Sequence, residues 1–421
     1  MDRMERTRPA EPSVGERIEL RRIQNALSRR VVANLVGRSE EWLRLVEAGR
    51  LRLDSIDVMI RLARVLRIED FRELIDWPTR SVSPASEVEA DLLCELRLQV
   101  LDHPVINMGR TVGGAPSSHL DLRLGLHRCE VVWAGHVRRY SLLAQELPGL
   151  LADARHRYRE SMTSEYGDLL IGIYRLCREL CSQLGAHDLA LIVADRAMLL
   201  ASRHSRSALL TTSACQVAIA LLQAGRCADA RRYAMAVAAK LQEEDESRRA
   251  VAGLRSATLQ GALHLLAASA ASSMLDPRGV ERSLAEADRI AFKVDGYRQV
   301  HGIGFGLYEV ELMRMEIALA RTDFEAVLRI AGAIDLPDNY PVNKRVRYHI
   351  MAAAAFASRR DDMGGVFELL KAVEASDEDL RYDTDAQRTV QILLRRDNKL
   401  LRRDLIRLAG AAGINVRATS G

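Results

Sequence analysis

Cysteine is scarce in this chain, and the spacing of its six cysteines argues against a disulfide framework or a metal site. No pair follows a CxxC pattern, and the ten histidines form no HExxH, HxH or Cys/His arrangement. Cys177 and Cys181 are four residues apart and share one face of a predicted helix, so a thiol pair or metal site there is the alternative to buried free thiols. Because free cysteine commonly behaves as a small buried apolar residue, we favour free thiols and expect no metal and no cofactor.

Long apolar segments are missing as well. No run approaches the roughly 20 apolar residues that a membrane-spanning helix needs. The first residues, MDRMERTRPAEPS, are charged and lack the apolar stretch of a signal peptide. We therefore expect a cytoplasmic protein with no membrane partner.

Motifs of the common enzyme classes are also missing. There is no P-loop, no GxSxG nucleophile motif and no glycine-rich nucleotide loop in a βαβ setting. These absences predict that the protein is not an enzyme.

Lysine is rare among the basic residues, since the chain has 56 arginines and five lysines. This bias is typical of a GC-rich genome, although the planar arginine fork also suits phosphate and guanine better than an ammonium group does. The formal net charge is only +4. Affinity for nucleic acid would therefore have to come from local clusters of arginine.

What the chain does contain is helical periodicity over at least two structural units. Its 421 residues exceed the roughly 250 to 300 that one core can serve. Proline is rare, strand-like alternation does not persist, and residues 78–86 have the Pro/Ser composition of a linker. We predict an all-α fold with a flexible N-terminus at 1–14, a small domain at 15–77, the linker, a connecting helix and loop at 87–118, and a helical repeat domain at 119–421.

The small domain reads as five short helices joined by tight connections. Ser28 and Ser39 are placed to cap two successive helices, and Gly49 is placed to end the second one in a left-handed conformation. Two helices that cross steeply over a short turn need a small residue at the crossing and a glycine in the turn, which Ala33 and Gly37 provide. The apolar residues expected to face their shared core are Val32, Val36, Leu43 and Val46.

This stretch resembles the helix-turn-helix of phage repressors and of the xenobiotic-response-element (Cro/repressor) family. The shared marks are Leu27-Ser28, Ala33, Gly37, Ser39 and Glu47-Ala48-Gly49-Arg50, followed by a supporting helix from Ser55 to Leu66. Residues 36–43 are also similar to large actinobacterial regulators. Arg29 departs from the pattern where Gln usually opens the first helix of the pair, and Arg38 departs at a turn position that is usually apolar. The resemblance implies a five-helix repressor-type domain that binds double-stranded DNA.

In that family the second helix of the pair lies in the major groove and presents its first exposed residues to the base edges. The resemblance assigns this role to Glu40, Glu41, Trp42, Arg44 and Leu45. Arg44 is suited to bond a guanine, either glutamate to accept from a cytosine amino group, and Trp42 to contact a thymine methyl group. The alternatives are structural: the glutamates complement the helix dipole, with Glu40 pairing Arg44, and Trp42 packs against the domain or a partner chain.

Contacts with the DNA backbone are expected from the arginines around this helix. Residues 15–67 contain 12 arginines and seven acidic residues, a net charge of +5. The predicted phosphate contacts come from Ser28 and from Arg29, Arg38, Arg50 and Arg52, and Ser39 completes the predicted DNA-binding set. A solvated charged face is the alternative for some of these arginines.

Residues 119–421 contain a repeated turn between an Ala/Leu-rich helix and a second amphipathic helix. The turn segments begin at Leu184, Leu222, Leu275, Arg321 and Arg359. With Ala190, Ala230 and Ala326 as markers, the spacing is about forty to fifty residues, which suits helical hairpins with extended helices. The region resembles degenerate tetratricopeptide arrays, and segments within it are similar to actinobacterial regulators that join such repeats to a repressor-type domain.

The same architecture occurs in peptide-pheromone sensors of Gram-positive bacteria, whose repeats clamp a linear peptide with several asparagines. Only Asn339 and Asn343 stand near a plausible groove in this chain, so the ligand is left open as a peptide, a small molecule or a protein partner. The polar residues predicted to line a groove are Gln216, His264, Tyr308, Glu309, Asn343, Arg345 and His349. The alternative for each is an ordinary packing or surface residue.

These features together predict a sequence-specific DNA-binding transcriptional regulator with a ligand-sensing repeat domain. A homodimer is expected, because operators of the family are usually read as two half-sites. The alternative is a protein-interaction scaffold whose repressor-like domain does not bind DNA.

Overall fold

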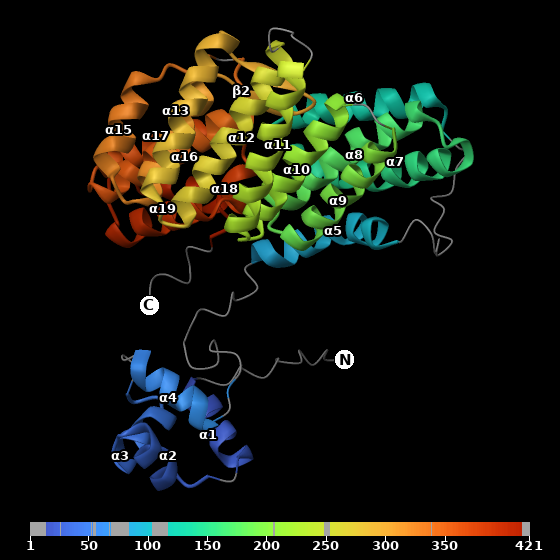
Figure 1. Ribbon diagram of the computed structural model, residues 1–421. Coiled ribbons are helices and arrows are strands. Elements are labelled where there is room, and N and C mark those ends of the chain that lie inside the picture. Colours follow the sequence, from blue (N-terminus) through green and yellow to red (C-terminus); the bar gives the residue numbers. More distant parts are fainter. Residues whose placement is uncertain are drawn as a thin grey trace, which may run out of the picture. The chain divides into compact units, whose positions relative to one another are not determined.

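The computed structural model describes a chain that is almost entirely helical, which confirms the predicted all-α class (Figure 1). The described residues are 14–25, 27–51, 53, 56–66, 68, 84–102, 117–204, 207–247, 253–337 and 339–414. The chain divides into two compact units, Met1–Ser86 and Glu87–Gly421. None of the helices within the described ranges has the length and apolar character that crossing a membrane requires.

The first unit has four helices within its described residues. They are α1 (Val14–Gln24), α2 (Arg29–Val36), α3 (Glu40–Glu47) and α4 (Ile56–Leu66). Their shared core contains the four predicted apolar residues Val32, Val36, Leu43 and Val46, all buried, together with Ile18 and Leu62. The fifth predicted helix and Arg52 lie outside the described residues.

The helix ends of this unit form where the sequence predicted them. Ser28 Oγ accepts from the Val31 N–H at 3.3 Å, and Ser39 Oγ accepts from the Trp42 N–H at 3.1 Å. Gly37 and Gly49 have φ values of 77° and 68°, so each ends a helix in the left-handed region that glycine adopts without a steric penalty.

Helix α1 begins directly against the end of α3. A Cβ atom on Gly15 would lie 2.4 Å from the carbonyl oxygen of Glu47, so only glycine allows this approach. The C-terminal end of α3 is therefore covered by α1, while Ser39, Glu40 and Glu41 at its start stay exposed.

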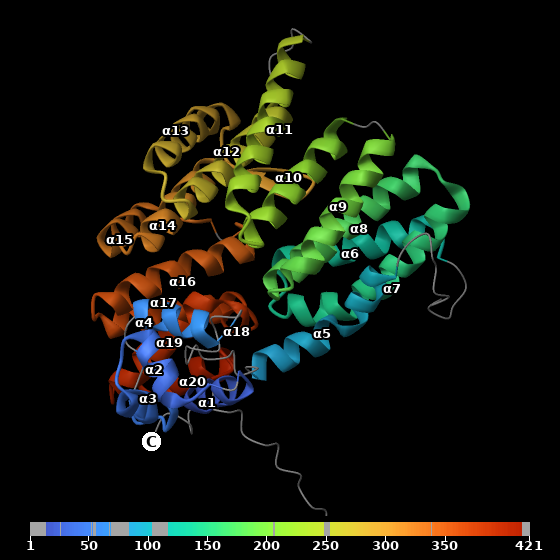
Figure 2. The ribbon, with the colours of Figure 1, turned by 60° about the horizontal axis from the view of Figure 1, so that its bottom comes forward.

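The second unit begins with α5 (Pro84–Leu101) and continues as an array of helices (Figure 2). Helix α5 starts three residues before the predicted Glu87, at a proline, which the first turn of a helix tolerates. The array comprises α6 (His119–Gly135), α7 (Arg139–Ser161), α8 (Ser164–Gln183), α9 (His187–His204), α10 (Ser207–Gln223), α11 (Cys227–Ser247), α12 (Leu254–Ser273), α13 (Pro277–Val294), α14 (Leu307–Ala320), α15 (Phe324–Ala333), α16 (Val342–Ser358), α17 (Asp362–Ala375), α18 (Asp379–Tyr382), α19 (Thr384–Arg396) and α20 (Arg402–Ala411).

All five predicted repeat turns join the two helices of a hairpin, and they share one backbone geometry. The second residue after each first helix has a positive φ; these residues are Gly185, Gly225, Leu275, Thr322 and Arg360. The next N–H then donates back to the last turn of the first helix, as from Ala186 to Cys181 O at 2.8 Å and from Asp276 to Ala271 O at 2.9 Å. This is the Schellman arrangement, which satisfies carbonyls that a helix end would otherwise leave unpaired.

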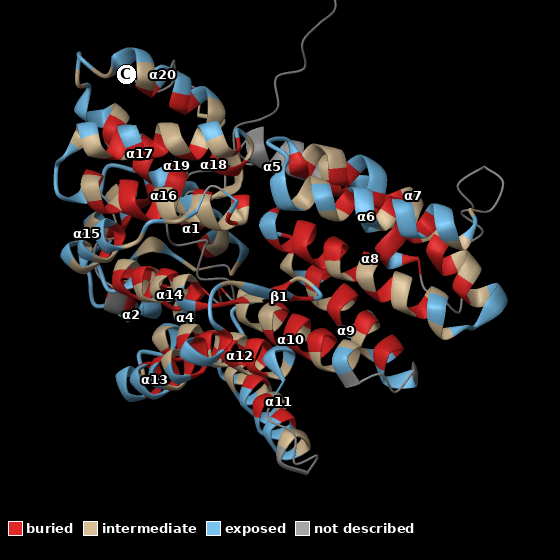
Figure 3. Cartoon of the chain, turned by 90° about the horizontal axis from the view of Figure 1, so that it is seen from above, coloured by how far each residue is buried: buried red, intermediate tan, exposed pale blue. Residues whose placement is uncertain are grey.

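A small buried residue follows each of these turns where the paired helices meet. The equivalent residues are Ala190, Ala230, Val280, Val327 and Gly365. The predicted marker Ala326 is therefore off by one position, because Val327 is the residue that faces the paired helix and Ala326 is only partly buried. Buried residues run along the faces where neighbouring helices contact each other (Figure 3).

A short hairpin interrupts the helical array and was not predicted. Strand β1 (Arg298–Val300) pairs antiparallel with β2 (Ile303–Phe305) across a turn at His301 and Gly302. Phe305 is fully buried against α12, where a Cβ atom on Gly261 would lie 2.2 Å from its ring. Strands of three residues are too short to show alternation in the sequence, which explains why the pattern did not reveal them.

Two parts of the array that are far apart in the chain contact each other. The Tyr140 N–H at the start of α7 donates to Glu378 Oε2 at 2.8 Å, and the Ser376 hydroxyl donates to the Val137 carbonyl at 3.1 Å. The region where α6 is followed by α7 is therefore joined directly to the region where α17 is followed by α18, in addition to the stacking of neighbours along the chain.

Candidate DNA-binding surface and ligand groove

The predicted base-reading residues lie on α3, and the start of this helix is exposed. Glu40, Glu41 and Arg44 are exposed, whereas Trp42 and Leu45 are half-buried. The opposite side of the helix, with Leu43 and Val46, is buried in the core. The folded domain therefore presents the predicted polar side chains of α3 to solvent.

Arg44 is paired with Glu41 and not with Glu40 as predicted. Its Nε and Nη2 atoms donate to the two carboxylate oxygens of Glu41 at 2.8 and 2.6 Å. The hydrogen bond from Arg44 holds the pKa of the Glu41 carboxyl below its usual value. Exposed pairs of this kind contribute little free energy, so Arg44 can exchange this carboxylate for an acceptor on a base at small cost.

Trp42 packs against the domain core, and the guanidinium of Arg38 lies 5.9 Å from the centre of its ring. This distance is that of a cation–π contact. The arginine in the turn thus covers the tryptophan, which accounts for a basic residue at a position where the resembling family has an apolar one.

Arg29 belongs to a network of ion pairs that connects three helices. Its Nε donates to Glu47 at 2.5 Å and its Nη2 to Glu19 at 2.6 Å. Arg22 donates to the same Glu47 carboxylate from Nε at 2.6 Å, and the Glu47 side chain is only 2% exposed. Hydrogen bonding to Glu47 raises the pKa of Arg29. The network orients α3 against α1 and α2, so Arg29 has a structural role whether or not it also contacts a phosphate.

The sequence analysis did not predict the buried ion pair between Arg22 and Glu47. Both residues look like surface charges in the sequence, and they are 25 positions apart. Ser28 and Arg50, two further predicted phosphate contacts, are exposed.

The second unit contains a groove of about 930 Å³ that its inner helices and the β-hairpin line. Both asparagines singled out in the sequence, Asn339 and Asn343, line it together with Glu309. The Glu309 carboxylate is 5% exposed and accepts from the Tyr340 hydroxyl at 2.7 Å and from Lys344 Nζ at 2.6 Å. Because these two donors already engage Glu309, it shapes the groove wall more than it offers a free acceptor.

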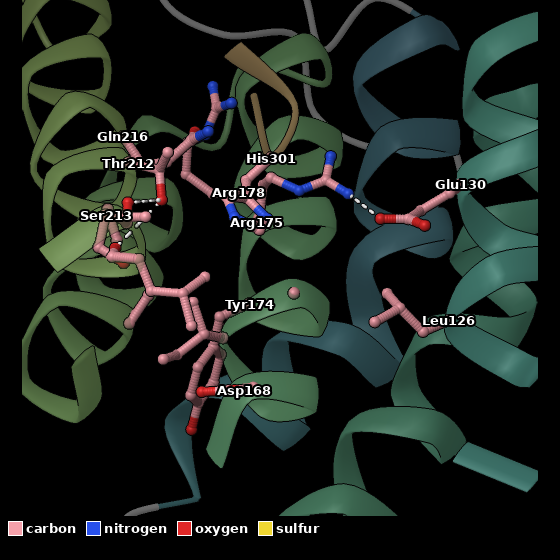
Figure 4. Close-up of a pocket in the computed structure, with 16 residues that line it drawn as sticks. Leu126, Glu130, Asp168, Tyr174, Arg175, Arg178, Thr212, Ser213, Gln216 and His301 are labelled. Atoms are coloured by element: carbon pink, nitrogen blue, oxygen red, sulfur yellow. Dashed lines mark hydrogen bonds and ion pairs between the residues drawn. The ribbon is translucent and has the colours of Figure 1, made fainter. Parts of the chain in front are cut away.

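A smaller cavity of about 330 Å³ lies beside α8 and α10, and the predicted residue Gln216 is one of the residues that line it (Figure 4). Arg175, Arg178, Glu130 and His301 line both this cavity and the groove. Among them, Arg175 donates to Glu130 at 2.5 Å. These four residues were not predicted, because helices α6 and α8 and the hairpin that supply them meet only in the folded array.

The remaining predicted ligand residues, His264, Tyr308, Arg345 and His349, line neither space. Burial lowers the pKa of His264 within α12. Tyr308 stacks edge-on against Tyr340 with 5.6 Å between ring centres, and Nδ1 of His349 lies 2.7 Å from Glu368 Oε2. The structure thus brings three of the seven predicted residues to a groove or cavity. His264, Tyr308 and His349 are in packing or ion-pair positions, and Arg345 is half-buried on α16.

Comparison with known proteins identifies the first unit. One solved structure similar to this chain is that of Bacillus thuringiensis PlcR in complex with the peptide PapR7 and DNA, which is 12% identical, with a TM-score of 0.31 over 67% of this chain and 95% of that chain. No curated protein matches the sequence. The family model described as a helix-turn-helix domain matches residues 13–75. The N-terminal unit of this chain is therefore a helix-turn-helix domain.

Proposed function

We propose that this protein is a DNA-binding transcriptional regulator that reads its operator with α3. The observation that carries the proposal is the helix-turn-helix domain in which the start of α3 is exposed and Arg44, one turn further along the helix, is exposed as well. An arginine on a helix in the major groove reads guanine by two parallel hydrogen bonds. Arg38 and Arg50, both exposed, supply positive charge for the DNA backbone.

The regulator acts in the cytoplasm as a homodimer and without enzymatic activity. Two-fold symmetric pairs place two reading helices about one helical turn of DNA apart, which is how this class of domain reads paired half-sites. The helical array provides the dimer contact and the sensor. A ligand that binds the groove shifts the balance between dimer arrangements with different affinity for the operator.

The ligand of the groove is a peptide, a small molecule or a segment of a protein partner. Asn339 and Asn343 support the peptide, because side-chain amides can both donate to and accept from a peptide backbone. The volume of the groove, 930 Å³, is large enough for several residues of an extended chain or a drug-sized molecule.

Footprinting on the DNA upstream of the gene for this protein tests the proposal. We expect one protected site at physiological salt, and Arg44→Ala should weaken specific binding by about 1 to 3 kcal/mol. Arg64→Ala, at an exposed arginine on α4, is the matched control and should leave the protected site unchanged. Absence of a discrete site would instead favour an interaction scaffold that does not read DNA. A protected site that Arg44→Ala leaves unchanged would contradict base reading by Arg44.

A further inference from the structure

The 330 Å³ cavity contains buried polar groups that have no hydrogen-bond partner among the described residues (Figure 4). These groups are Oε1 and Nε2 of Gln216, Oγ of Ser213 and Nε of Arg178. The three residues are 3%, 2% and 6% exposed, so solvent does not reach them from outside the fold. Unpaired buried polar groups are costly and rare in folded proteins, and several on the wall of one cavity point to a bound molecule.

The two arginines that line the cavity are already paired with carboxylates. Arg175 contacts Glu130 at 2.5 Å and Glu179 at 3.3 Å, and Arg178 contacts Glu179 at 3.3 Å. A charged ligand would find no uncompensated guanidinium to pair with. The lining of the cavity also includes apolar side chains, among them Leu126, Ile171 and Leu209.

We propose that this cavity binds an uncharged small molecule that carries an amide group and an aliphatic group. The Gln216 side chain offers one donor and one acceptor to the ligand amide, which needs both. Ser213 Oγ on α10 and Arg178 Nε on α8 belong to residues that line the same cavity, and they supply further hydrogen bonds to the ligand carbonyl. The aliphatic group packs against the leucine and isoleucine side chains.

The size of the cavity agrees with this class of ligand. A volume of 330 Å³ is at the lower end of the roughly 300 to 1,000 Å³ of ligand pockets in proteins. The proposal rests on the sensing role of the array, and it adds a second, smaller binding site to the groove.

Titration of the full-length protein with N-acetyl-L-leucinamide, an uncharged molecule with two amides and an isobutyl group, tests the proposal. We expect saturable binding, and Gln216→Met should weaken it about tenfold, because methionine keeps the length of glutamine and removes both hydrogen-bonding atoms. The matched control is Gln242→Met on α11, at an exposed residue that lines neither the cavity nor the groove. This variant should bind the probe as the wild type does.

The melting temperature without ligand provides a second readout. If Gln216 has no internal partner, Gln216→Met should melt at the wild-type temperature or above it, because no hydrogen bond is lost. A lower melting temperature would show that the fold itself uses the amide, and the proposal would then be wrong. It would be equally wrong if the wild type did not bind the probe, or if Gln216→Met bound it as tightly.

Footprinting in parallel separates this inference from the proposed function. Probe binding without a protected DNA site would contradict the regulator and leave the amide site intact. A protected site without probe binding would contradict the amide site alone.

Discussion

Nη2 of Arg139 lies 2.5 Å from Oδ1 of Asp379, although the two residues are 240 positions apart. Arg139 is fully buried, and its guanidinium lies 5.6 Å from the ring centre of Trp133 and 5.0 Å from that of Tyr140. The Tyr140 hydroxyl donates to the same Asp379 oxygen at 2.7 Å. A helical array usually depends on contacts between neighbouring repeats, so this buried pair adds a long-range contact between α7 and α18.

Removal of Asp379 should destabilise the array strongly. Asp379→Ala leaves the Arg139 guanidinium buried without a carboxylate, and loss of one partner of a buried pair costs about 3 to 5 kcal/mol. Chemical denaturation of the full-length protein measures the change. The control is Arg402→Ala, which breaks the Arg402–Asp397 pair whose side chains are 59% and 62% exposed, and which should change stability little. Equal effects of the two variants would show that Asp379 does not hold α7 and α18 together.

The Glu47 carboxylate should be essential for the rigidity of the helix-turn-helix domain. Glu47→Gln removes the charge that Arg22 and Arg29 share, and we expect a loss of about 3 kcal/mol in the local free energy of opening. Hydrogen exchange at the backbone amides of α1 to α3 measures it. Glu41→Gln, which removes an exposed partner of Arg44, should leave this exchange unchanged; faster exchange in both variants would contradict the special role of Glu47.

Replacement of Leu275 in its turn by glycine should stabilise the folded protein. Leu275 has a φ of 55° and is 88% exposed, so its side chain adds strain without packing. We expect Leu275→Gly to raise the free energy of unfolding by about 0.5 to 1 kcal/mol, since glycine adopts the left-handed conformation without a steric penalty. Denaturation curves of this variant and of Met274→Gly provide the measurement and its control. Met274 has a φ of −89°, so glycine there should destabilise; a gain at both positions would argue against relief of strain.

A methyl group on Gly261 should displace the β-hairpin. Gly261→Ala places a Cβ atom 2.2 Å from the Phe305 ring, so the ring must move, and we expect a loss of about 1 to 3 kcal/mol. Gly332→Ala in α15 is the matched control, because no atom lies within 4 Å of its Cβ position and alanine is the better helix former. Thermal denaturation should rank Gly261→Ala below the wild type and Gly332→Ala above it. A wild-type melting temperature for Gly261→Ala would mean that the hairpin does not pack on α12 as described.

Acidification should destabilise the wild type through His264. Burial lowers the pKa of His264 in the folded protein below its ordinary value of 6.5, so the unfolded chain takes up a proton first. Stability linked to this residue is therefore fully present above pH 6.5 and is lost as the pH falls through the folded pKa. His264→Gln, which does not titrate, should lose less stability than the wild type between pH 7 and pH 5 in denaturation curves. Parallel loss in both proteins would assign the pH dependence to other groups.

The helices, their caps and their turns were predictable because they depend on residues near one another in the chain. Ser28 and Ser39 needed only the next three residues to form their caps. The repeated turns were visible in the sequence, although Leu275, Thr322 and Arg360 show that the geometry does not require glycine. The pairing of Arg44 was not predictable at this level, since Glu40 and Glu41 are both within reach on the same helix and rotamer geometry decides between them.

The amino-acid sequence by itself determined an all-α protein with a helix-turn-helix at its N-terminus and helical hairpins after it, since local spacing and capping specify those elements. Tertiary structure alone decided which charges are buried in pairs, as with Arg22 and Glu47, and which polar groups, as with Gln216, line a cavity. The physical reason is that burial depends on which surfaces approach one another after folding, and residues tens or hundreds of positions apart supply those surfaces.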